Sequence, residues 1–359
     1  MNYTINNNNV DMTDCNMTAA LPLHSQLVNS TEGTLTNYKK VVDKHQKNQY
    51  GLSKSDLRLA EKKLKDQKEF LTFSYLYDRI NKNSIPLSEL IISANHSPNR
   101  YYSEIQNRVN TLTKVAKQIE LKPLFMTITL PSEFHKYKKK GKTLVKNPKY
   151  NGVTPKDSVK VLTKMFAKLR QDRSLKELSK EQRVYFRVNE PHKNGTPHTH
   201  ILMYVPADRV DRVKKAFKRL FNEKSNDIQD DINNSTSYIM KYINKTLPLS
   251  KNKKLSEQEK YLNAWYVKHK IVRFNSSRTL APLSLYRMLH SRYSLFVLTE
   301  LLYAGHLSIY SELDSNKVVQ IIDEFGDTVY TRSSNFDVIL RGNYFPNNSQ
   351  PNDSAVGVA

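Results

Sequence analysis

Cysteine and long apolar runs are scarce in this sequence, and each shortage excludes a class of protein. Among its 359 residues there is a single cysteine, Cys15, which excludes an internal disulfide framework and a four-cysteine zinc site. No apolar run approaches the roughly 18 to 20 residues that a membrane helix needs. The N-terminus lacks the basic and apolar segments of a secretory signal. We therefore expect a soluble, cytoplasmic protein without a membrane partner.

Acidic residues are few relative to basic ones, and this imbalance indicates the kind of partner. The 57 Lys and Arg against 34 Asp and Glu give a formal net charge of +23. Such an excess favours a polyanion, because each phosphate that is neutralised releases condensed counterions. A ribosomal protein or a protein at an anionic membrane surface would share the imbalance. The charge favours a nucleic-acid partner without identifying it.

A nucleotide-binding P-loop is also missing. Gly141-Lys142-Thr143 resembles the end of such a loop, but Lys136 stands where its first glycine must be. The segment from 136 to 149 is predicted to be a loop that is rich in lysine and poor in glycine, so its backbone amides cannot wrap around a triphosphate. The sequence predicts neither ATPase nor helicase activity, and no use of ATP.

Composition and periodicity divide the chain into five segments. Residues 1–36 are rich in Asn and Thr, which predicts a disordered arm. Residues 37–119 are predicted to be a helical lead-in, with helices over about 53–83 and 103–119. The remaining segments are a core domain over 120–248, a mostly helical region over 249–345 and a loose tail over 346–359. Helices are expected in that fourth segment over about 257–269 and 283–304, and a terminal hairpin over 318–332.

The order of elements in the core predicts an α+β fold. A strand over 124–130 precedes a helix that Thr154 and Pro155 open as N-cap and first residue. Two further strands, 183–190 and 198–205, are joined by a short turn containing Asn194-Gly195, which predicts an antiparallel hairpin. Helices over about 209–221 and 236–245 follow. We expect an antiparallel sheet with helices packed on it, and helical extensions at both ends.

His198 and His200 form the first cluster of chemical interest. On a strand of period two both imidazoles project from one face and can share a divalent metal. Glu190 ends the partner strand and could add a carboxylate, with His192 in the turn as the competing third ligand. Two ordinary hairpin histidines would show the same spacing. Two nitrogens, one oxygen and open positions suit Mg²⁺ or Mn²⁺ acting on a phosphate.

Tyr238 and Tyr242 form the second cluster. On a helix, the i, i+4 spacing places both phenols on one face. Lys241 and Lys245 each follow a tyrosine by three residues, and cations there suit phosphate binding and stabilise a phenolate. An amphipathic surface helix in a chain with 21 tyrosines would show the pair as well.

Further residues are expected to contact DNA or to support the site. Thr127 and Thr129 share one face of the first core strand, where they could meet DNA or support the metal ligands. A basic groove is expected between the 136–149 segment and the helix over 209–219. The candidate DNA-binding residues in it are Lys138, Lys139, Lys140, Lys142, Arg212 and Arg219.

Three motifs in this order resemble the bacteriophage replication gene A proteins of the HUH endonuclease superfamily, over about residues 121–290. The first is Phe125-Met126-Thr127-Ile128-Thr129-Leu130-Pro131-Ser132, followed by Phe134-His135. The second runs from Arg187 to His200 and the third, with two tyrosines, from Tyr238 to Lys245; the Ala264-Trp265 and Val272-Arg273-Phe274 region is similar too. Asn194 and Thr199 depart from the family pattern, where an Asp and an aromatic residue are common.

The resemblance implies a function and a role for each cluster. His198 and His200 would be metal ligands, Tyr238 and Tyr242 nucleophiles, and Lys241 a group at the phosphate. The protein would nick one strand of single-stranded or supercoiled origin DNA, keep the 5′ end on a tyrosine and start rolling-circle replication in the cytoplasm of a bacterial host. A host helicase and DNA polymerase would be its partners. A non-catalytic DNA-binding regulator and a metal-dependent nuclease that uses water are the alternatives.

Overall fold

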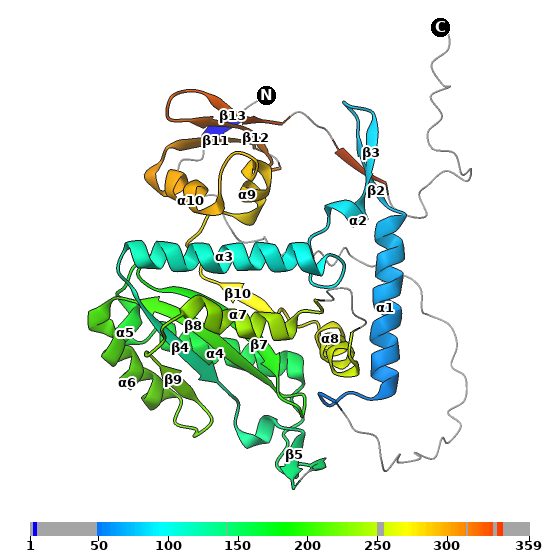
Figure 1. The fold of residues 1–359 in the computed structure, drawn as a ribbon, viewed down its shortest axis with the longest axis vertical. Helices are drawn as coiled ribbons and strands as arrows, with labels where there is room; N and C mark the ends of the chain where they lie inside the picture. The colour runs from blue at the N-terminus through cyan, green and yellow to red at the C-terminus, as the bar shows by residue number, and fades with distance from the viewer. Residues whose placement is uncertain are drawn as a thin grey trace.

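The computed structural model describes residues 3–5, 49–141, 143–249, 255–313, 315–332 and 336–339. Its centre is a five-stranded antiparallel sheet in the order β10-β7-β8-β4-β9 (Figure 1). These strands are β4 (Lys122–Ile128), β7 (Val184–Pro191), β8 (Pro197–Val205), β9 (Asp227–Gln229) and β10 (Phe274–Ser276). The α+β fold expected from the order of elements is confirmed.

Helices cover both faces of this sheet. On one face α3 (Pro98–Gln118) and α7 (Ser235–Thr246) pack on side chains such as Phe125, Val188 and Leu202. On the other face α4 (Pro155–Arg170), α5 (Arg173–Lys176) and α6 (Val210–Leu220) pack on the alternate residues, such as Met126 and Ile201. The alternation of strand side chains therefore assigns α6 and α7 to opposite faces of the sheet. Thr154 caps α4 as expected.

A smaller sheet lies beyond α3, on the side away from the central sheet (Figure 1). It has the order β1-β11-β12-β13 and packs with α9 (Leu283–Leu289) and α10 (Leu295–Ala304). Its strands are β1 (Tyr3–Ile5), β11 (Leu307–Glu312), β12 (Val318–Asp323) and β13 (Thr328–Thr331). The expected terminal hairpin corresponds to β12 and β13, which pair antiparallel. The single helix expected over 283–304 is instead two, because Ser294 caps a new helix at Leu295.

The lead-in contains strands as well as helices. The helix expected over 53–83 ends earlier, as α1 (Lys54–Thr72). A hairpin of β2 (Tyr75–Asp78) and β3 (Asn83–Pro86) follows, with β14 (Phe336–Ile339) on its edge and the short α2 (Leu87–Leu90) after it. α1 packs against α8 (Glu257–His269) in a third apolar cluster around Trp265. The 75–83 part of the helix prediction was wrong because Tyr75–Asp78 form a strand that pairs with the distant β14.

The lysine-rich segment expected to be a loop forms a second hairpin. β5 (Tyr137–Lys140) pairs with β6 (Thr143–Lys146) after a 3₁₀ turn over Ser132–Phe134, and a second 3₁₀ turn over Ala207–Arg209 precedes α6. Tyr3–Ile5 lies in the arm expected to be disordered, yet pairs with β11. The rest of that arm, Lys142, 250–254 and the tail lie outside the described residues. No helix of the described parts is long and apolar enough to cross a bilayer.

Candidate active site: a histidine pair, a glutamate and two tyrosines

His198, His200 and Glu190 converge on one point beneath α7. In the β7–β8 pairing Glu190 lies opposite His198, and both histidines project to the α7 face as their spacing predicts. The two Nε2 atoms lie 3.0 Å apart, and Glu190 Oε2 is 3.8 Å from His200 Nε2. One donor atom from each residue lies within 4.8 Å of the others. All three side chains are buried.

A divalent cation fits this group. Metal–nitrogen bonds of about 2.1 Å at a right angle place two ligand atoms about 3 Å apart, which matches the separation of the imidazole nitrogens. Glu190 Oε2 is buried without a hydrogen-bond partner, as expected of an oxygen that serves a metal. Three protein ligands leave open coordination positions for phosphate oxygens, which suits Mg²⁺ or Mn²⁺.

The protonation states of the ligands favour cation binding. Burial first, then the charge of Lys245 and the neighbouring His192, lowers the pKa of His200 to about 3. The pKa of His198 is lowered too, first by burial and then by the surrounding imidazoles and Lys245. Both imidazoles are therefore neutral at pH 7 and offer a lone pair. Burial raises the pKa of Glu190, and Lys245 opposes that rise.

Thr127 supports one of the ligands. Its Oγ1 lies 3.0 Å from His200 Nδ1, and a proton on that nitrogen leaves Nε2 free for the metal. Thr129 has different partners, since its backbone N–H donates to Asn226 Oδ1 and its hydroxyl contacts Ser225. Thr127 therefore takes the supporting role that its position in β4 indicates, and Thr129 anchors the segment before β9.

Glu190 fits the third-ligand position better than His192. The donor atoms that converge are those of Glu190 and the two histidines. His192 stacks its ring on that of His198, with centroids 4.0 Å apart, and burial lowers its pKa to about 4. The ring face of His192 therefore fixes the orientation of His198. The nitrogens of His192 are not among the donor atoms that converge with those of His198, His200 and Glu190.

Tyr242 lies directly beside His200, and Tyr238 lies one helical turn away. The buried Ile239 and Ile243 hold α7 against the sheet, which turns the tyrosine face toward the cluster. The ring of Tyr242 is 3.8 Å from that of His200, centroid to centroid, and 6.0 Å from that of Tyr238. Burial, then Tyr238, Glu190 and Asp227 raise the pKa of Tyr242 to about 12.

The two lysines of α7 have different surroundings. Lys245 forms an ion pair with Glu190, and so contacts a metal ligand instead of lying free beside a phenol. Lys241 is exposed on α7. Sequence spacing places both lysines near the tyrosines, but the pairing of Lys245 depends on how α7 crosses β7.

A clamp on the β7–β8 turn was missed by the sequence analysis. The backbone N–H of Tyr50 donates to Lys193 O at 3.1 Å, and Trp265 Nε1 donates to Gly195 O at 3.0 Å. Gly195 has φ +90°, and a Cβ built there would lie 2.4 Å from Tyr50 O. The residues that hold the turn come from far along the chain, so only the Asn194-Gly195 pair gave a local signal.

The basic residues expected in a single groove lie on different parts of the molecule. Lys138 and Lys140 are exposed on β5, which also carries Lys139. This strand lies beyond the C-terminal end of β4 (Figure 1). Lys142 lies outside the described residues. Arg212 and Arg219 lie on α6, across the sheet from the histidines, and Arg219 pairs with Asp172. α6 packs on the face of the sheet opposite the histidines, so within the described residues it does not border a groove beside them.

Comparison with known proteins identifies relatives. Residues 23–249, more than half of the chain, match the family model described as bacteriophage replication gene A protein. The replication gene A protein of Escherichia phage 186 is 29% identical over 199 residues, or 50% of this chain and 27% of that protein. The replication protein of Haemophilus phage HP1 is 32% identical over 181 residues, or 46% and 22% of the two chains.

A third relative is named for an enzymatic activity. A probable replication endonuclease from a prophage-like region of Escherichia coli O6:H1 is 27% identical over 239 residues, or 59% of this chain and 29% of that protein. The chain thus spans less than a third of the length of these curated relatives. No solved structure matches the chain.

Proposed function

Because the chain belongs to the bacteriophage replication gene A protein family, we propose that it is a rolling-circle replication initiator of the HUH, two-tyrosine type. In this proposal it is a metal-dependent, site-specific endonuclease for single-stranded DNA that also rejoins strands. Its nucleophiles are Tyr238 and Tyr242, its metal ligands His198, His200 and Glu190, and its metal Mg²⁺ or Mn²⁺.

The observation that carries the proposal is the position of Tyr242 beside a buried His-His-Glu group. The centroid of the Tyr242 ring lies 3.8 Å from that of the His200 ring, and His200 is neutral at pH 7. A phosphate bound at the open positions of that group would therefore lie within reach of the phenol oxygen. If the two tyrosines served only the fold, the buried Glu190 Oε2 next to them would have no explanation for its missing hydrogen-bond partner.

The first step is a transesterification. The Tyr242 phenol gives up its proton as its oxygen attacks the phosphorus. The bond from phosphorus to the 3′ oxygen breaks, and the leaving oxygen takes up a proton to become a 3′-OH, so the number of protons is unchanged. His198, His200 and Glu190 would hold a divalent cation, which would supply Lewis-acid stabilisation of the phosphate charge. In the free site Tyr242 is a phenol, since its pKa is about 12. The 5′-phosphotyrosine that results keeps the bond energy, so rejoining needs no ATP.

The second tyrosine completes the cycle. When the origin has been copied, Tyr238 cleaves it and releases a new 3′-OH. That hydroxyl attacks the Tyr242 phosphotyrosine, forms a phosphodiester and frees the phenol. Lys241 and Lys245 would bind the phosphates on the tyrosine face of α7. The 3′-OH from the first step primes a host polymerase, and a host helicase would separate the strands.

The test uses 5′- and 3′-labelled single-stranded fragments of the protein's own replicon, incubated with Mn²⁺ or EDTA and run on denaturing gels. We expect a metal-dependent band in which protein is attached to the downstream fragment. Tyr242→Phe should lose this first cut, while Tyr238→Phe should nick but fail to close circles. His198→Ala should abolish both reactions. Tyr303→Phe is the matched control, because that tyrosine is exposed on α10.

Other outcomes favour the rival functions. Metal-dependent cleavage that survives replacement of both tyrosines would indicate a nuclease that uses water. Tight binding across the replicon without any cleavage would indicate a DNA-binding regulator. Full activity of the His198→Ala variant would refute the metal assignment.

A further inference from the structure

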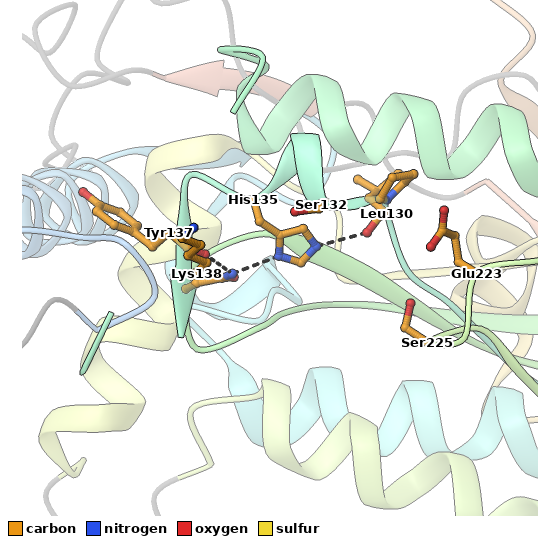
Figure 2. Close-up of a pocket in the computed structure, with 9 residues that line it drawn as sticks. Leu130, Ser132, His135, Tyr137, Lys138, Glu223 and Ser225 are labelled. Carbon is orange, nitrogen blue, oxygen red and sulfur yellow. Dashed lines mark hydrogen bonds between the residues drawn. The ribbon is translucent and has the colours of Figure 1, made fainter. Parts of the chain in front are cut away.

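A hollow opens beside the candidate active site, at the end of β4 (Figure 2). Its volume is about 310 Å³, at the lower end of the roughly 300–1,000 Å³ range of small-ligand pockets. Polar groups from four segments line it: Ser132 and His135 after β4, Tyr137 and Lys138 on β5, Asn194 in the β7–β8 turn, and Glu223 and Ser225 after α6. None of these residues has a role in the proposed cleavage chemistry.

The imidazole of His135 is held rigidly at this hollow. Its Nε2 lies 3.0 Å from Leu130 O, and a carbonyl only accepts, so Nε2 carries the proton. Nδ1 then accepts from Asn194 Nδ2 at 2.9 Å, and the same amide also donates to Tyr137 O. Both ring nitrogens are thus occupied, and only the ring surface is available to a ligand.

The polar groups around this ring match the parts of a nucleotide. Figure 2 shows Tyr137 and Lys138 on one side of His135, with Glu223 and Ser225 on the other. An imidazole ring and a phenol ring offer stacking surfaces to a base, and the exposed Lys138 offers a cation to a phosphate. Glu223 repels phosphate, but its carboxylate accepts hydrogen bonds from the amino group of a base.

The hollow is connected to the metal ligands by short contacts. Ser225 Oγ lies 2.5 Å from Thr129 Oγ1, two residues along β4 from Thr127, which contacts His200. The rings of His135, His192 and His198 follow one another with centroid separations of 5.6 and 4.0 Å. A strand whose phosphate lies at the metal group would therefore bring a neighbouring nucleotide to the hollow.

We propose that this hollow binds one unstacked base of the DNA strand, next to the phosphate that is cleaved, and selects a base with an exocyclic amino group. His135 and Tyr137 stack on the base, Glu223 accepts from its amino group, and Lys138 binds the adjacent phosphate. Thymine lacks the amino group and is disfavoured. The inference rests on the proposed function, because that function supplies the single-stranded DNA.

The experiment measures base preference independently of cleavage. The Tyr238→Phe, Tyr242→Phe double variant is used to find the replicon oligonucleotide that binds most tightly. Each base of that oligonucleotide is then replaced in turn by the other three, and affinities are measured by fluorescence anisotropy. At one position, replacement of an amino-bearing base by thymine should weaken binding about tenfold. Adding Glu223→Gln should remove that preference and leave the other positions unchanged.

The matched control is Glu133→Gln, the same substitution on an exposed carboxylate of the neighbouring turn that does not line the hollow. Glu223 is exposed, so its replacement leaves the fold intact. An unchanged base preference at every position in the Glu223→Gln variant would overturn the inference. If the protein with both tyrosines forms no covalent adduct on the same oligonucleotide, the proposed function fails instead, whatever the base preference.

Discussion

Gly195, three residues before His198, is packed closely against the backbone of Tyr50. An alanine there would place its Cβ 2.4 Å from Tyr50 O, in addition to the strain of φ +90°. We predict that Gly195→Ala lowers the free energy of unfolding by roughly 3 kcal/mol or more, because backbone atoms on both sides must move. Urea denaturation followed by the fluorescence of Trp265, the only tryptophan, measures this directly.

The Gly152→Ala variant distinguishes the backbone strain of a positive φ from the steric clash with Tyr50. Gly152 has φ +83°, and a Cβ there would meet nothing within 4 Å. This control variant should lose only the roughly 1–2 kcal/mol that a left-handed alanine costs. Equal losses in the two variants would mean that the contact with Tyr50 does not constrain the turn.

His269 makes stability depend on pH. Burial first, then Lys268, lowers its pKa to about 4 in the folded protein, against about 6.5 in the unfolded chain. Between these values the unfolded chain binds a proton that the folded protein does not. Stability is therefore full above about pH 6.5 and falls as the pH falls toward 4.

We predict that His269→Gln makes this loss smaller. The ring is partly exposed, so solvent screening reduces its contribution to the order of 1 kcal/mol between pH 7 and 4.5. Urea titrations of both proteins in EDTA at several pH values measure the two slopes. Identical slopes would show that His269 does not titrate differently in the two states.

At the scale of secondary-structure elements, Arg273 connects α7, α8 and the strand β10. Its guanidinium donates to Thr246 O at the end of α7 and to Asn263 Oδ1 in α8, and lies 3.9 Å from the ring centre of Tyr266. Arg273 is buried. One planar cation thus fixes the end of the helix that carries both tyrosines.

Arg273→Lys should destabilise the protein by roughly 3 kcal/mol, because a single ammonium cannot form this set of contacts in a buried site. Arg219→Lys is the control: that arginine pairs with Asp172 but is 63% exposed, so its replacement should cost less than about 1 kcal/mol. Urea midpoints compare the two variants, and similar losses would contradict a connecting role for Arg273.

At the scale of the whole molecule, the net charge of +23 does not act evenly on DNA. Lys138 lies at the hollow beside the candidate site, whereas Arg212 lies on α6 across the central sheet. The logarithm of the affinity for single-stranded DNA falls as the logarithm of the salt concentration rises. Lys138→Gln should make this negative slope shallower by about 0.7. Arg212→Gln should leave the slope unchanged. Fluorescence anisotropy from 50 to 300 mM salt tests both variants, and a larger effect of Arg212 would place the DNA on the other face.

Local patterns predicted the core of the protein because they depend on backbone geometry over a few residues. The period of two on β8 put His198 and His200 on one face, and the period of 3.6 on α7 did the same for Tyr238 and Tyr242. The predictions failed where a distant partner overrides local preference. Residues 75–78 form β2, which pairs with the distant β14. The lysine-rich segment is a different case, because its β5–β6 hairpin is a local pairing that composition did not indicate.

The sequence alone thus determined which chemical groups this protein carries and which of them share a face, since covalent spacing and secondary-structure period decide both. Tertiary structure decided the rest. It pairs Lys245 with Glu190 and places Tyr242 rather than Tyr238 beside His200. It also packs Tyr50 and Trp265 against Gly195, and it places α6 on the face of the sheet opposite the site. These contacts join residues more than about 40 positions apart, or concern opposite faces of a sheet, and only the packing of the whole chain sets such distances.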